Sequence, residues 1–86
     1  MQMGESVTYY EIILADGSGD NPAGLARRRQ LDQGGIEDEM LRPDMSWQPD
    51  SLIVEWKRGD SVEELREISA DEAAALVERF RQRWAE

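Results

Sequence analysis

Residues 69–84 read SADEAAALVERFRQRW, and this stretch decides the fold of the 86-residue chain. Its apolar residues recur at spacings of three and four, which predicts a helix with one apolar stripe. Ser69 followed three residues later by Glu72 is a capping box, which satisfies backbone N–H groups at a helix start. Acidic residues near the start and arginines near the end suit the helix dipole. The stripe that the rest of the chain must cover consists of Ala73, Leu76, Val77, Phe80 and Trp84.

The length and composition limit what the chain can be. We treat residues 1–86 as a single domain with one core, and we expect residues 1–6 to be disordered. The chain has no cysteine and no histidine, which removes disulfides, the commonest zinc ligands and the usual general base near neutral pH. No glycine-rich phosphate loop or other catalytic motif is present. We therefore expect a protein that is not an enzyme and that holds no metal or cofactor.

The charge is strongly acidic, with 19 acidic against 10 basic residues and a net charge of -9. This argues against nucleic-acid binding, because the phosphate backbone would be repelled. The acidic surface either keeps the chain in solution or binds a basic partner, as an inhibitor or a nucleic-acid mimic would. Arginines interrupt the acidic stretches, which counts against a mimic. No apolar run is long enough to span a membrane and no secretory signal is evident, so we expect a cytoplasmic protein.

Residues 8–15, TYYEIILA, are rich in aromatic and β-branched side chains and predict a strand. Tyr9, Glu11 and Ile13 share one face of it. Because Tyr9 and Ile13 are apolar, we expect that this face is either half-exposed or covered by a partner. The opposite face carries no charge and should face the core; it consists of Tyr10, Ile12 and Leu14.

Residues 16–24, DGSGDNPAG, predict a surface loop. Asp16, Ser18 and Asp20 alternate like the first ligands of a calcium-binding loop. The match fails at Asn21, where glycine is needed, and at Arg27, where the closing glutamate is needed. A plain loop is the preferred interpretation, and a weak oxygen-ligand metal site is the alternative.

Residues 25–31 and 36–41, LARRRQL and IEDEML, predict a hairpin. We expect its turn to be centred between Gln33 and Gly34. The arginines would then form ion pairs with the acidic arm, which commits them to the hairpin and leaves no anion site. The expected opposite pairs are Arg27 with Met40, Arg28 with Glu39, Arg29 with Asp38, Gln30 with Glu37 and Leu31 with Ile36.

Beyond Pro43 and Asp44, which should end the second arm, residues 50–58 predict a short helix, with a fourth strand as the alternative. Residues 64–69 predict a strand, with one helical turn as the alternative. The expected fold is α+β: a mostly antiparallel four-stranded sheet with two helices on one face, in the order β-β-β-α-β-α.

The aromatic residues suggest where a partner could bind. We expect Trp56 and Phe80 in the core, whereas Trp47 lies between loop breakers and Trp84 lies in the last helical turn. These two tryptophans either cap the edges of the core or anchor a partner, because aromatic residues are enriched at binding hot spots. The candidate partner-binding residues are Tyr9, Ile13, Trp47 and Trp84.

Three hypotheses of function follow from these observations. The first is a non-enzymatic interaction module that binds a protein partner or a second copy of itself. The second is an acidic inhibitor or nucleic-acid mimic. The third is a small-ligand binder that uses a pocket lined by Tyr9, Tyr10 or Glu11.

Four segments, PAGLARRR, GGIEDE, SWQPDSL and EISADEA, together resemble short uncharacterised proteins of actinobacterial genomes. The strong preference for arginine over lysine is typical of a GC-rich bacterial genome. The resemblance implies a small cytoplasmic bacterial protein of unknown function, and it brings no cofactor or catalytic residue.

Overall fold

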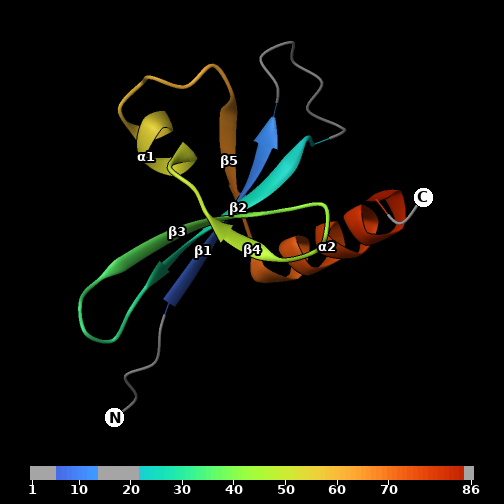
Figure 1. Cartoon of the computed structure of the whole chain (residues 1–86), viewed down its shortest axis with the longest axis horizontal. Coiled ribbons are helices and arrows are strands. Elements are labelled where there is room, and N and C mark those ends of the chain that lie inside the picture. Colours follow the sequence, from blue (N-terminus) through green and yellow to red (C-terminus); the bar gives the residue numbers. More distant parts are fainter. Residues whose placement is uncertain (1–5, 14–21, 85–86) are drawn as a thin grey trace.

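The computed structural model describes residues 6–13 and 22–84. These residues form one antiparallel sheet of five strands, in the order β4-β3-β2-β1-β5, together with two helices (Figure 1). The expected α+β class and antiparallel sheet are confirmed, but the expected count of four strands is wrong. The elements are β1 (Ser6–Ile13), β2 (Gly24–Gln30), β3 (Ile36–Leu41), β4 (Trp47–Pro49), α1 (Leu52–Lys57), β5 (Glu64–Ile68) and α2 (Ala70–Trp84).

Two predictions fall on the termini and on the loop after β1. We expected residues 1–6 to be disordered. Ser6 is the first residue of β1, and the other five residues lie outside the described ranges. The candidate calcium ligands Asp16, Ser18 and Asp20 also lie outside the described residues. In the part of the chain that is described, no helix is long and apolar enough to cross a membrane.

The additional strand, β4, follows a tight turn after β3. The N–H of Arg42 donates to the carbonyl of Ser46 at 2.9 Å, and Met45 takes a left-handed conformation with φ of 69°. The Asp44 carboxylate accepts hydrogen bonds from the Ser46 hydroxyl and, secondly, from the Ser46 N–H, and these bonds lower the pKa of Asp44. Pro43 and Asp44 follow the end of a strand, as expected. The turn that contains them then brings the chain back beside β3 as β4. A three-residue strand is too short to produce a periodic pattern.

The β2–β3 hairpin differs from its prediction by one residue in register. The Leu31 N–H donates to the Gly35 carbonyl at 2.8 Å, and the Gly34 N–H donates to Leu31 at 2.9 Å, so three residues form the loop. Gly34 has φ of +95°, as such loops require. The expected two-residue loop needs a positive φ at Gln33 as well, which is unfavourable without glycine. The observed opposite pairs are Arg27 with Glu39, Arg28 with Asp38, Arg29 with Glu37, Gln30 with Ile36 and Ala26 with Met40.

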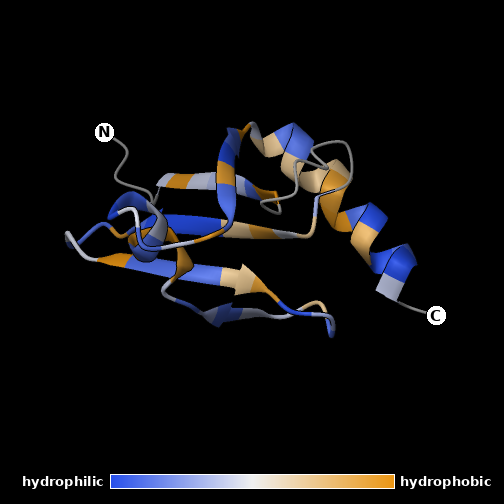
Figure 2. Cartoon of the chain, turned by 90° about the horizontal axis from the view of Figure 1, so that it is seen from above, coloured by the Kyte–Doolittle hydropathy of each residue, from blue (hydrophilic) through white to orange (hydrophobic). Residues whose placement is uncertain are grey.

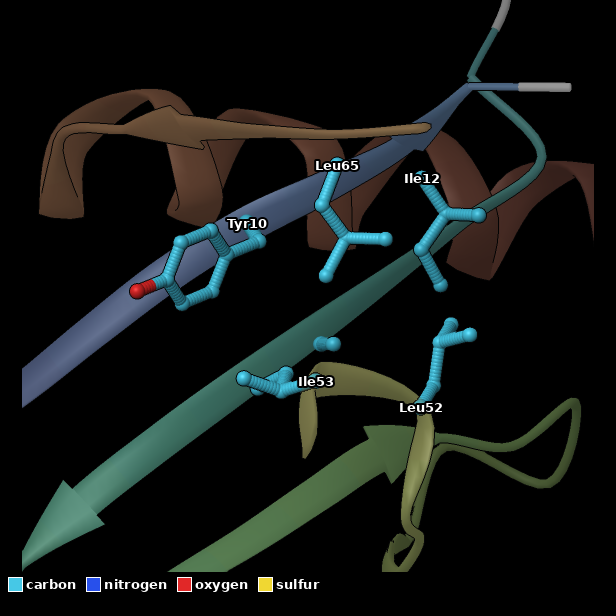
Figure 3. Packing of buried hydrophobic residues seen from close by; sticks show 6 residues of the cluster. Tyr10, Ile12, Leu52, Ile53 and Leu65 are labelled. Carbon is cyan, nitrogen blue, oxygen red and sulfur yellow. The ribbon is translucent and has the colours of Figure 1, made fainter. Parts of the chain in front are cut away.

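The two helices lie on opposite faces of the sheet, so their expected placement on one face is wrong. α1 packs against a cluster that includes Tyr10 and Leu65, and Figure 3 shows these side chains facing Leu52 and Ile53 while α2 passes behind the strands. α2 packs against the other face with a cluster formed by Leu25, Leu41, Ala73, Leu76 and Phe80. Because side chains alternate along a strand, both faces of β1 are apolar and each needs a cover. The face of Tyr9, which we expected to be either half-exposed or covered by a partner, is covered by α2.

The predictions for residues 69–84 are confirmed. Glu72 accepts a hydrogen bond from the Ser69 N–H at 2.9 Å, and the Glu72 N–H donates to the Ser69 hydroxyl at 3.0 Å. The bond from the Ser69 N–H is the main reason that the pKa of Glu72 is lowered. Phe80 is fully buried, and hydrophobic and hydrophilic residues alternate along α2 in Figure 2.

Candidate functional site at the edge of strand β5

Two of the sequence-predicted partner residues, Tyr9 and Trp47, lie together. Their ring centroids are 6.3 Å apart, and the Arg27 guanidinium lies 4.1 Å from the centroid of the Trp47 ring. Both aromatic side chains are partly buried against the α2 cluster. They line a small pocket of about 140 Å³ beside the start of α2.

The other two predicted residues lie elsewhere. The Trp84 ring stacks on Phe80 with 4.7 Å between centroids, in the last turn of α2. Ile13 is half-buried at the end of β1, opposite Glu64 of β5. Neither lines the pocket of Tyr9 and Trp47. A partner-binding role for Tyr9, Ile13, Trp47 and Trp84 remains a prediction.

Two residues of the small-ligand hypothesis line separate pockets: Tyr9 the small pocket beside the start of α2, and Glu11 a groove between β5 and α2. Tyr9 and Glu11 lie on the α2 face, whereas Tyr10 is buried under α1 with its ring 5.8 Å from that of Trp56. Burial, and secondly the Glu67 carboxylate, raise the pKa of the Tyr10 hydroxyl.

The charges of the hairpin are paired. Arg27 binds Glu39 at 2.7 Å, and Arg28 binds Asp38 at 2.8 Å, an arrangement that raises the pKa of Arg28. Arg29 binds Glu37 at 3.0 Å. The expectation that these arginines form ion pairs with the acidic arm is therefore confirmed, although each faces a different residue from the one expected.

The region around β5 is different, because its acidic residues lack such partners. Within residues 6–13 and 22–84, none of five carboxylates between positions 63 and 72 makes an ion pair. Two of these carboxylates accept hydrogen bonds at a turn and a cap: Glu63 from the Ser61 hydroxyl and Glu72 from the Ser69 N–H. The five are Glu63, Glu64, Glu67, Asp71 and Glu72. Among the described residues, a group of carboxylates without an ion pair thus lies in and beside this strand.

β5 is an edge strand whose outward peptide groups can be identified. In an antiparallel sheet, the peptide groups of successive residues point to alternate sides. The Ile12 carbonyl accepts a hydrogen bond from Ala23, at the β2 side of β1. The N–H and C=O groups of residues 9, 11 and 13 therefore point toward β5. The residues of β5 opposite them are Ile68, Arg66 and Glu64. It follows that the N–H and C=O groups of Leu65 and Glu67 point away from the sheet, where no described strand lies.

The opposite edge of the sheet, formed by β4, is less suited to such pairing. The Asp50 N–H donates to the Asp38 carbonyl at 3.1 Å and the Arg42 N–H to Ser46 at 2.9 Å, so even-numbered residues of this segment face β3. The N–H and C=O groups of Trp47 and the C=O group of Pro49 then point outward. Proline has no N–H, and its presence on an edge strand is a common protection against unwanted strand pairing.

A groove runs between β5 and α2, with a volume of about 390 Å³. The buried Glu11 carboxylate accepts hydrogen bonds from the Arg66 guanidinium, which is largely exposed. Within the described residues, Arg79 makes no ion pair. The groove has charged walls and a short apolar floor; its lining residues are Glu11, Arg66, Glu67, Ile68, Glu72, Ala75, Leu76 and Arg79.

The sequence predicted β5 as a strand but did not reveal its edge position. The order of strands in a sheet is a tertiary property, and one strand does not encode it. The excess of acidic over basic residues beyond position 59 was the available signal.

Comparisons of the chain with protein-family models, with curated proteins and with solved structures gave no match. Across residues 6–13 and 22–84, no three carboxylates gather in an arrangement that could hold a metal ion.

Proposed function

We propose that the chain is a cytoplasmic, non-enzymatic protein-interaction module, which binds an extended segment of a partner protein along β5. The observation that carries this proposal is the outward direction of the peptide groups of Leu65 and Glu67, with no described strand beside them. Addition of a strand to an open sheet edge is a common way of recognising peptides.

The energetics require both the edge and the adjacent groove. Two outward residues offer two N–H donors and two C=O acceptors, and four hydrogen bonds at about 0.5 to 1.5 kcal/mol each supply roughly 2 to 6 kcal/mol. A micromolar complex needs about 8 kcal/mol. Side chains of the partner must supply the remainder, and the groove between β5 and α2 is where alternate side chains of an added strand would lie. The groove would therefore determine which partner sequences bind.

A nucleic-acid mimic has less support. A mimic of the phosphate backbone needs a continuous acidic surface, whereas Arg27, Arg28 and Arg29 pair with the acids of β3. The hairpin surface is therefore close to neutral.

The test is a selection of random linear peptides displayed on phage, followed by binding measurements on variants. Glu67→Pro removes an outward N–H without removing a bond to β1, because the peptide group of Glu67 does not face that strand. Glu67→Gln keeps the N–H and is the matched control. We expect selected peptides to bind the unchanged protein, to keep most of their affinity for Glu67→Gln, and to lose binding to Glu67→Pro.

The fold of Glu67→Pro is checked by its amide NMR spectrum. Failure to select any peptide, or selected peptides that bind Glu67→Pro unchanged, would refute strand addition at β5.

A further inference from the structure

We infer that the segment which binds β5 is basic, with lysine or arginine at alternate positions. This inference rests on the proposed function and specifies its partner. It starts from the distribution of charge among the described residues, because the hairpin arginines pair with the acids of β3, whereas the five carboxylates at β5 and at the start of α2 make no ion pair. A segment that approaches this edge meets an excess of carboxylates, and a cationic segment is attracted to it.

The side chains of β5 indicate on which face of an added strand basic side chains would lie. The side chain of Glu67 lies on the α1 face of the sheet, since Glu67 is opposite Tyr10, and it is exposed. A residue directly opposite Glu67 on an added strand would have its Cβ about 4.5 to 5.5 Å from that of Glu67, a distance at which opposite charges attract. The partner side chain opposite Glu67, on the α1 face, is therefore cationic.

The groove face has a different character. There Glu11 is already bound by Arg66, and Glu72 accepts a hydrogen bond from the Ser69 N–H. Ile68, Ala75 and Leu76 form an apolar floor. Partner side chains that enter the groove are therefore small or apolar. Because successive side chains of a strand alternate between faces, the bound segment alternates basic and apolar residues.

A second copy of the chain is a poor occupant of the same edge. The register that bonds both outward residues places Leu65 of one copy opposite Glu67 of the other. It also places Arg66 opposite Arg66, and like charges directly opposite are destabilising. Two chains that each carry a net charge of -9 also repel at long range.

The experiment compares three synthetic peptides of equal length, in which valine alternates with lysine, glutamine or glutamate. Binding is measured by fluorescence anisotropy at low and at physiological ionic strength. We expect the lysine peptide to bind most tightly and to weaken as salt is added. Glu67→Gln should weaken it about two- to fivefold. Asp32→Asn is the matched control, because it removes the same charge from the distant hairpin turn, and it should have a smaller effect.

The outcomes separate the two proposals. If the glutamine or glutamate peptide binds as tightly as the lysine peptide and Glu67→Pro abolishes that binding, the basic character is wrong and strand addition stands. An equal loss in Asp32→Asn and Glu67→Gln would also overturn recognition at Glu67. If the lysine peptide binds Glu67→Pro unchanged, strand addition at β5 is wrong. Absence of binding by all three peptides would overturn both.

Discussion

The ion pair between Glu11 and Arg66 should respond unequally to removal of its two partners. Glu11 is the buried member, with 9% of its side chain exposed, whereas 62% of the Arg66 side chain is exposed. Arg66→Met therefore leaves a carboxylate without its cation inside the fold. Glu11→Gln instead leaves a guanidinium that water can solvate. The loss of stability should depend on which charge remains.

The structure sets the size of the difference. A buried charged acceptor that loses its hydrogen-bond partner costs about 1 to 3 kcal/mol, so Arg66→Met should lower the free energy of unfolding by that amount. Glu11→Gln should cost less than about 1 kcal/mol, because the amide oxygen can still accept from Arg66. A chain of this length has about 4 to 13 kcal/mol of stability, so both variants should fold. The double variant should be more stable than Arg66→Met alone, because the buried charge is gone.

Urea denaturation followed by tryptophan fluorescence measures these free energies, provided that the dependence on urea is unchanged among the variants. A loss in Glu11→Gln that equals or exceeds the loss in Arg66→Met would refute the reasoning. So would a double variant less stable than Arg66→Met.

Two further predictions concern the cap of α2 and the hairpin turn. The lowered pKa of Glu72 means that its contribution to stability is present above the unfolded value of 4.5 and is lost as pH falls through the folded-state value. Urea denaturation at several pH values in this acidic range should show that the free energy of unfolding falls more steeply for the unchanged protein than for Glu72→Gln, which keeps the bond from Ser69. Parallel curves for the two proteins would contradict this. Gly34→Ala should destabilise the fold by about 1 kcal/mol, because Gly34 has positive φ. Gly35→Ala is its control and should change stability by less than about 0.5 kcal/mol in thermal unfolding; equal losses in the two variants would show that the turn conformation is not the cause.

The sequence predicted those elements whose evidence is local. α2 carries its periodicity and its capping box within residues 69–84, and α1 is flanked by Pro49 and Gly59. The ion pairs of the hairpin were predictable from the opposite charges of its arms. The register was not, because the two-residue and the three-residue loop both place Gly34 at a positive φ and differ in whether Asp32 belongs to the strand or to the loop.

The arrangement of elements could not be read in the same way. Tyr9 and Tyr10 point to opposite faces of β1, so the sequence showed two apolar faces, but it did not show that α1 would cover one and α2 the other. The candidate site depends on β5 lying at the edge, beside β1, which no pattern within residues 64–68 contains. Pairing between strands far apart in the chain decides it.

Pro49 on β4 has a consequence for assembly. A sheet that is open at both sides can stack head to tail without limit, and this produces fibres. Here the three-residue β4 lacks a donor at Pro49, which disfavours main-chain bonding at that side and favours a single addition at the other. The complex that forms should have one-to-one stoichiometry and should not polymerise as concentration rises.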